Sequence, residues 1–369
     1  MDSRHLNVRL TIFSDPKDSG RAFMSISESP FGGTDWEEVD LTSLKAPLGK
    51  PWEESLYILA HPHEDEDNSR AKEIGKEIYN VMFGSGAGEV FRRSLGSVNN
   101  PQTLRLAIDC QAQQNSILSE LPWELLHDGA QFISSRKCSI IRIDRNLSDQ
   151  ETFFGPLNSV AIITAMPSAN DSGQAFNQSE YCNQLKENLS YCPTVEFVDN
   201  ATRKGILKLF ENRQFDLVYF LGYGRPGEVI LHNDNGGEDI VNAGDFAQLI
   251  SGDDGKARLI YLNCCYGGTP ETKKISLSSI ANVLLREKVT HTVVAMQSKI
   301  ELKDALSLAA EFLDRAIKLG DPEEALAKAR LLHSDNWLRS IPNLFTHVDG
   351  PEKYRRNRLM CLLLSLIHI

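Results

Sequence analysis

Two short apolar runs, Phe215-Asp-Leu-Val-Tyr-Phe-Leu221 and Arg258-Leu-Ile-Tyr-Leu262, decide the fold of this chain. The first run is closed by Gly222-Tyr223-Gly224 and the second by Asn263-Cys264-Cys265-Tyr266-Gly267-Gly268. Continuous apolar runs that end in glycine are typical of strands covered on both faces of a parallel sheet. In open α/β sheets, binding and chemistry gather beyond the carboxyl ends of such strands. The residues at these two ends are therefore the first candidates for a functional site.

The flanking sequence predicts strands and helices in alternation, joined by short connections. Following the break at Gly155-Pro156, the pattern predicts strands at 159–164, 194–198 and 292–296, and helices at 179–189, 204–210, 243–249, 276–285, 302–319 and from 321 onward. A small hairpin is expected around the Asn-Asp-Asn-Gly-Gly turn at 233–237. This alternation is the signature of a parallel sheet covered on both faces. We therefore predict an α/β fold, a mostly parallel sheet sandwiched by helices.

The first part of the chain is richer in strand patterns. Residues 5–27 alternate apolar and polar side chains around a turn, which predicts a β-hairpin with one buried face. Residues 30–51 are predicted to be a loop, 64–83 an amphipathic helix and 103–109 a strand. We expect a β-rich N-terminal part over 1–150, an α/β part over 151–349, and a linker with a truncated or out-of-frame tail over 350–369.

Composition limits the classes of function. The chain has 369 residues, 41% hydrophobic and 24% charged, with a net charge of −11, so a basic nucleic-acid-binding surface is not expected. Its seven cysteines lack zinc-like spacing, which indicates free thiols in a reducing compartment. No signal-peptide pattern opens the chain, and the apolar stretch 359–369 is shorter than the roughly 20 residues of a membrane helix. We expect a cytoplasmic protein without membrane contact.

The two glycine-closed strand ends resemble those of the caspase-like (clan CD type) cysteine peptidases, and in detail those of CHAT domains, a bacterial branch of that group. In that family the first strand ends in Gly-His-Gly, whose His is the general base, and the second in Asn-Ala-Cys, whose Cys is the nucleophile. Cys265 falls on the nucleophile and Asn263 on the preceding Asn, but Tyr223 stands where the His is expected. The segment Leu121-Pro-Trp-Glu-Leu-Leu126, with Arg142 closing the next strand, is a second resemblance to CHAT domains. Apart from the resemblance, it is interpreted as a proline-started helical turn with its Trp in the core.

The replacement at Tyr223 decides the functional interpretation. A phenol with a pKa of about 10 stays protonated near neutrality, whereas an imidazole near 6.5 accepts and returns a proton. The resemblance therefore implies a pseudopeptidase or regulatory module, in bacterial signalling or defence, with a protein substrate or regulatory protein as partner and a longer multidomain chain around it. The alternative is an active cysteine endopeptidase in which Cys265 uses a displaced base. A doubly wound small-ligand binder is the third interpretation.

Several residues are candidates for parts of such a site. Gly222 and Gly224, with Asn263 and Cys264, are predicted to line the pocket or supply oxyanion donors. Cys264 is also interpreted as a core residue, and Cys265 as either a pocket thiol or a buried structural one. His232 and His291 are the candidate displaced bases, each with the alternative of an ordinary surface or strand-edge histidine.

Three further patterns are given their simpler interpretations. Gly84-Ser-Gly-Ala-Gly88 follows a helix and lacks the Gly-Lys-Ser/Thr ending of a phosphate loop, so it is interpreted as a helix stop. His61-Pro-His63 lies in a charged stretch and is not expected to hold a metal. The apolar stripe of 302–319 is expected to face the protein's own core. We predict no metal and no cofactor.

Overall fold

The structure is a computed structural model. It describes residues 5–18, 20–45, 69–99, 103–110, 118, 121–135, 138–143, 155–166, 177–225, 227–251, 257–266, 278–296, 302–331 and 342–346. The stretch 61–63 and the expected linker and tail at 350–369 lie outside these residues.

The described strands form a single sheet of thirteen strands. Its path runs β10-β9-β8-β11-β12-β13-β5-β4-β1-β2-β3, with β6 paired to β7 and β8. Seven of the twelve pairings are parallel. The strands are β1 His5–Ser14, β2 Arg21–Glu28, β3 Glu37–Asp40, β4 Thr103–Cys110, β5 Cys138–Ile143, β6 Ser159–Ala165, β7 Thr194–Val198, β8 Leu217–Arg225, β9 Glu228–His232, β10 Glu238–Asn242, β11 Ala257–Tyr266, β12 Thr290–Met296 and β13 Pro342–Thr346.

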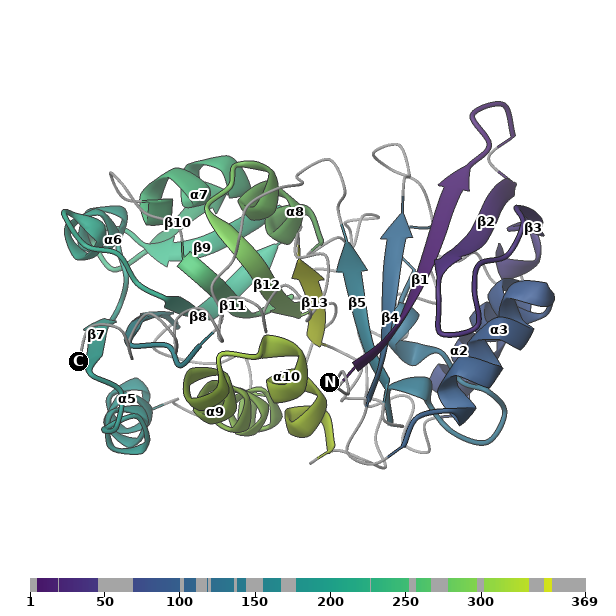
Figure 1. Ribbon diagram of the computed structural model, residues 1–369. Coiled ribbons are helices and arrows are strands. Elements are labelled where there is room, and N and C mark those ends of the chain that lie inside the picture. Colours follow the sequence, from purple (N-terminus) through teal and green to yellow (C-terminus); the bar gives the residue numbers. More distant parts are fainter. Residues whose placement is uncertain are drawn as a thin grey trace.

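Helices cover both faces of the central strands of this sheet, which confirms the predicted α/β class (Figure 1). On one face of the central strands, Phe246 of α7 packs edge-on against Phe220 of β8, with ring centroids 5.3 Å apart. On the other face, Phe312 of α9 packs against Tyr261 of β11 at 4.9 Å. The helices are α2 Ser69–Phe83, α3 Gly86–Gly96, α5 Gln178–Asn188, α6 Arg203–Phe210, α7 Ala243–Ser251, α8 Ser278–Arg286, α9 Leu302–Leu319 and α10 Pro322–Leu331.

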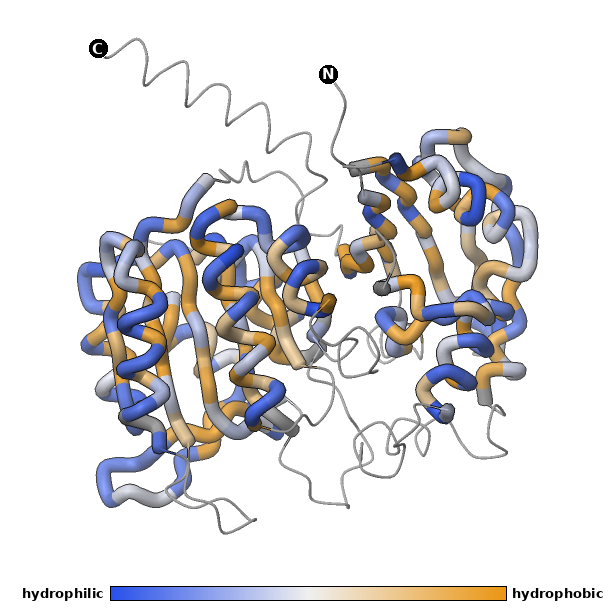
Figure 2. Tube along the Cα trace, turned by 90° about the horizontal axis from the view of Figure 1, so that it is seen from below, coloured by the Kyte–Doolittle hydropathy of each residue, from blue (hydrophilic) through white to orange (hydrophobic). Residues whose placement is uncertain are grey.

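The hydrophobic residues follow this layering. Figure 2 shows them concentrated along the central strands, between helices of mixed hydropathy. The apolar stripe of α9 is buried, as expected, with Leu308, Phe312 and Leu313 fully enclosed. Burying apolar surface of this kind stabilises a fold by about 25 cal/mol per Å². The core therefore lies on both faces of the sheet, beneath the helices.

The β-rich N-terminal part joins the rest of the fold edge to edge through β13. This short strand pairs antiparallel with β12 on one side and parallel with β5 on the other. A second link lies at the start of α10, where Glu323 accepts from the Nε of Arg105 on β4 at 2.9 Å. Both side chains are almost fully buried, at 1% and 4% exposed. One sheet therefore runs through the expected N-terminal and α/β parts.

The Leu-Pro-Trp-Glu-Leu-Leu segment at 121–126 has a structural role in the fold. Trp123 is fully buried in a 3-10 turn over Trp123–Leu125, and its Nε1 donates to the Leu118 carbonyl at 3.0 Å. Glu124, also fully buried, accepts from Arg142 Nη2 at 2.7 Å. The same Nη2 donates to the carbonyl of Leu121 at 2.9 Å. The turn is thus held to β5 by a buried ion pair between the two parts of the motif.

Most of the predicted element boundaries agree with the structure to within a few residues, with one correction. The stretch 30–51, predicted as a loop, contains the strand β3, which pairs antiparallel with β2. Its sequence Glu-Glu-Val-Asp has a single apolar residue, so the pairing comes from the neighbouring strand and not from its own pattern. The glycine run at 84–88 does end one helix, since α2 stops at Phe83 and α3 begins at Gly86.

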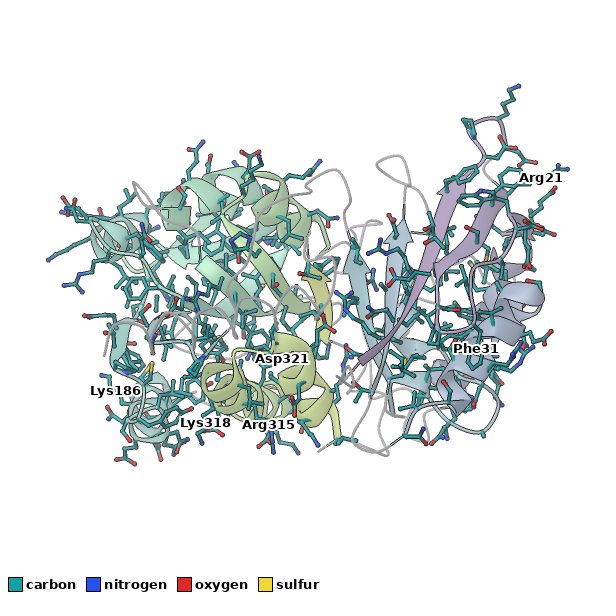
Figure 3. The ribbon with its side chains drawn as sticks, viewed as in Figure 1. Arg21, Phe31, Lys186, Arg315, Lys318 and Asp321 are labelled. Atoms are coloured by element: carbon teal, nitrogen blue, oxygen red, sulfur yellow. The ribbon has the colours of Figure 1, made fainter. Side chains whose placement is uncertain are left out.

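The last helix, expected from 321 onward, begins at a capping residue. Asp321 lies between α9 and α10 (Figure 3). Its Oδ1 accepts from the backbone N–H groups of Glu323 and Glu324, each at 3.0 Å. A capping carboxylate satisfies donors that the first turn of a helix leaves without partners. Asp321 therefore fixes where α10 begins.

Candidate active site

The two glycine-closed strand ends lie side by side. Strands β8 and β11 are parallel neighbours, and Cys265 pairs in register with Tyr223. Neighbouring strands lie about 4.8 Å apart, and residues paired across them belong to the same face of the sheet. The position predicted for the nucleophile is therefore directly beside the position predicted for its base. The side chain of Cys265 lies outside the described part of the structure.

A buried polar network lies just below this point, on the face that carries positions 223 and 265. Asn263 is 1% exposed, and its Nδ2 donates to the Tyr219 hydroxyl at 2.9 Å and to the Ala305 carbonyl at 3.3 Å. The Tyr219 hydroxyl lies 3.0 Å from that of Tyr181 on α5. Burial, reinforced by Tyr219, raises the pKa of Tyr181 well above the usual phenol value. Tyr181 therefore stays protonated and able to donate.

One buried oxygen of this network accepts no hydrogen bond from the described residues. This oxygen is the Oδ1 of Asn263. A buried acceptor without a partner costs about 1–3 kcal/mol. The two donor contacts of the amide must therefore outweigh this loss for Asn263 to keep its orientation.

The glycines beside Tyr223 lie in close packing on the opposite face of the sheet. A Cβ at Gly224 would lie 3.3 Å from the Cβ and 3.4 Å from the Sγ of Cys264. At Gly222 it would lie 2.8 Å from the Phe220 ring and 3.2 Å from the Ala165 carbonyl oxygen. Cys264 itself is fully buried. Close packing thus accounts for Gly222, while the contacts at Gly224 are tight but not prohibitive, and the role of both glycines as oxyanion donors stays a prediction.

The two candidate displaced bases lie in very different places. Thr292 pairs with Leu259 near the start of β11, and His291 precedes it by one residue. At about 3.3 Å per residue, His291 is more than about 20 Å along the strands from position 265. His232 lies two residues past Ile230, which pairs with Tyr223, and its Nε2 is 3.1 Å from the Met166 carbonyl oxygen. Of the two, His232 is therefore at the relevant end of the sheet, and its ring contacts the backbone of Met166, the residue that follows β6.

Sequence reasoning missed the network beneath the site. Asn263 was singled out only as a pocket candidate, while Tyr181 and Tyr219 gave no signal beyond their place in a predicted helix and a predicted strand. In the described residues, no group of three His, Cys, Asp or Glu side chains is arranged to hold a metal ion. Nor does any helix among them have the length and apolar character needed to cross a bilayer.

Comparison with known proteins places the chain in a family. The family model for the CHAT domain matches residues 73–343, well over half of the chain. No curated protein matches the sequence.

Several solved structures are similar at low identity. The Arg-specific cysteine proteinase gingipain R of Porphyromonas gingivalis has a TM-score of 0.45 and 12% identity, covering 75% of this chain and 66% of its own. The Saccharomyces cerevisiae separase–securin complex has a TM-score of 0.42 and 12% identity, covering 84% of this chain and 23% of its own. The Drosophila initiator caspase Dronc has a TM-score of 0.30 and 11% identity, covering 49% of this chain and 74% of its own. On the family-model match, the chain belongs to the CHAT domain family.

Proposed function

We propose that this CHAT domain is a pseudopeptidase, a cytoplasmic regulatory module of bacterial signalling or defence that binds a protein partner at a site built like that of a cysteine peptidase. The observation that carries the proposal is the pairing of Cys265 with Tyr223. A cysteine peptidase needs a base that takes the thiol proton and returns it to the leaving amine. Tyr223 occupies the position from which that base would act.

The chemistry of the two side chains supports a large loss of activity. An ordinary phenol is almost wholly protonated at neutral pH, so it does not take up the thiol proton. Removing one member of a catalytic triad leaves only about 10³- to 10⁴-fold catalysis over water, from binding and oxyanion stabilisation. The network around Asn263 still fixes the strand end, which favours a retained binding site over an abandoned one.

The competing function is an active cysteine endopeptidase with a displaced base. His232 is its candidate, because it lies at the carboxyl end of the sheet. Its Nε2 contact with the Met166 carbonyl assigns the proton to Nε2 and leaves Nδ1 as the acceptor. Two strand spacings, about 10 Å, separate β9 from β11. Direct proton transfer from Cys265 to His232 therefore requires one of the two residues to move toward the other. This requirement favours the pseudopeptidase.

The test is the pH dependence of Cys265 alkylation by iodoacetamide, followed by mass spectrometry. The natural protein is compared with Tyr223→His, and Cys265→Ala is the blank. We expect slow alkylation of the natural protein below pH 8 and at least about tenfold acceleration by Tyr223→His, because an imidazole beside a thiol stabilises the thiolate. Fast alkylation of the natural protein below pH 7, abolished by His232→Gln, would instead establish the active endopeptidase.

A further inference from the structure

Four neighbouring strands carry a row of residues at one level of the sheet. Cys265 of β11 pairs with Tyr223 of β8, Tyr223 pairs with Ile230 of β9, and Ile230 pairs with Ile240 of β10. Paired residues belong to the same face, so the row leads from the candidate nucleophile to the edge of the sheet. Ile230 and Ile240, the aliphatic residues of this row, are next to the candidate site and are not part of the hydrophobic core.

The two faces of the β9–β10 hairpin differ sharply in exposure. On the face toward α7, Val229 and Val241 are fully buried. On the face of the row, Ile230 is half-buried and Ile240 is 42% exposed. One exposed aliphatic side chain is ordinary for a protein surface, but Ile240 continues an apolar row that starts at the candidate site, so the row is accessible to a partner at its outer end.

The edge of this hairpin is less accessible than its face. Arg203 of α6 donates from Nη2 to the backbone carbonyl of Ile240 at 3.3 Å and binds Asp239 through Nε at 2.8 Å. A charged side chain that donates a hydrogen bond to a backbone carbonyl of an edge strand hinders another strand from pairing there. A partner is therefore expected to lie across the face and not to extend the sheet.

The charged side chains on this face indicate what kind of partner it would bind. Alternation along β9 and β10 places Glu228 beside Ile230 and Glu238 beside Ile240, on the open face. Arg225 lies 3.6 Å from Glu238, but both side chains are well exposed, at 44% and 64%. Exposed pairs of this kind are worth little, so Glu238 remains available to a basic ligand.

We propose that the open face formed by Tyr223, Ile230 and Ile240, with Glu228 and Glu238, binds an extended segment of a partner protein that combines apolar and basic residues. The inference rests on the proposed function, because this surface extends the proposed partner-binding site outward from position 265. The apolar residue of the partner covers Ile230 and Ile240, and its Lys or Arg residues meet the two carboxylates.

The test uses the full chain and a fluorescein-labelled hexapeptide of alternating Ile and Lys, with fluorescence anisotropy as the readout. Peptides of alternating Ile and Glu and of alternating Ser and Lys separate the apolar from the charge requirement. The variants are Ile240→Ser and Glu238→Gln. Leu319→Ser is the matched control, because Leu319 on α9 is similarly exposed, at 39%.

We expect saturable binding of the Ile–Lys peptide, weakened at least about fivefold by Ile240→Ser and by Glu238→Gln and unchanged by Leu319→Ser. Thermal unfolding checks that each variant is folded. Equal binding by all variants, or equal binding of the Ile–Glu peptide, would overturn the inference. Because Cys265 alkylation is measured without peptide, an already activated thiol would overturn the proposed function and leave the peptide result standing.

Discussion

Tyr223 and Cys265 are paired in register on the neighbouring parallel strands β8 and β11, so a tyrosine occupies the position directly beside the cysteine. Tyr223 is half-buried and packs against the core, which gives its ring a structural role independent of its hydroxyl.

Tyr223→Phe should therefore leave the reactivity of Cys265 nearly unchanged. The variant keeps the ring and removes only the hydroxyl, and an ordinary phenol is a poor base near neutrality. We expect iodoacetamide alkylation of Cys265 to stay within about twofold of the natural protein between pH 6 and 9, because the proposal gives the hydroxyl no part in forming the thiolate. A drop of tenfold or more would mean that the hydroxyl activates the thiol, and the pseudopeptidase proposal would fail.

Asn263→Leu should destabilise the protein through the network beneath the site. The change removes the donor to the Tyr219 hydroxyl and to the Ala305 carbonyl, both buried acceptors. We expect the free energy of unfolding in urea to fall by about 1–3 kcal/mol. Tyr181→Phe serves as the comparison, because it removes only the outer hydroxyl and leaves the contact of Asn263 with Tyr219 in place. If both variants lost the same stability, Asn263 would not be the centre of the network.

Glu124→Ala should be among the most destabilising single changes. It leaves the guanidinium of Arg142 buried without its carboxylate, which costs about 3–5 kcal/mol. The matched control is Glu196→Ala, because Glu196 and Arg213 also form a 2.7 Å ion pair, but with both side chains about half exposed. An exposed pair contributes about 1 kcal/mol or less, so the control should unfold close to the natural protein. Similar losses in the two variants would show that burial does not strengthen the Glu124–Arg142 pair.

The ion pair of Glu124 with Arg142 also shows where sequence reasoning stops. Both residues belong to the pattern that resembles CHAT domains, and the pattern correctly predicted a turn with Trp123 in the core. Nothing in the spacing indicated that the carboxylate and the guanidinium meet. Their contact depends on how the turn folds back on β5, and side-chain contacts across elements have no periodic signature.

Strand and helix positions in the central part were predictable because each element carries its own hydrophobic pattern. Strands β3 and β13 lack such a pattern, and each is held by strands beside it. β13 is five residues long, begins with Pro342 and pairs with β5, about 200 residues earlier in the sequence. The continuity of the sheet was therefore not predictable, whereas two strong apolar patterns predicted the strands that end at Tyr223 and Cys265, and the family resemblance predicted that these ends lie together.

The thiol of Cys182 should make stability fall at high pH. Burial, together with a hydrogen bond from Sγ to Asp199 Oδ1 at 3.2 Å, raises the pKa of this thiol to about 12 from an ordinary value of 9.0. Only the unfolded chain then ionises Cys182 between these values, so its stabilising contribution is complete below pH 9 and is lost as pH rises toward 12. Urea unfolding of the natural protein and of Cys182→Ala from pH 7 to 10.5 should show a difference that stays constant up to about pH 8 and then shifts steadily in favour of the variant. Titration of the other groups is common to both proteins and cancels. Curves that stay parallel to pH 10.5 would mean that the folded protein ionises Cys182 as readily as the unfolded chain does.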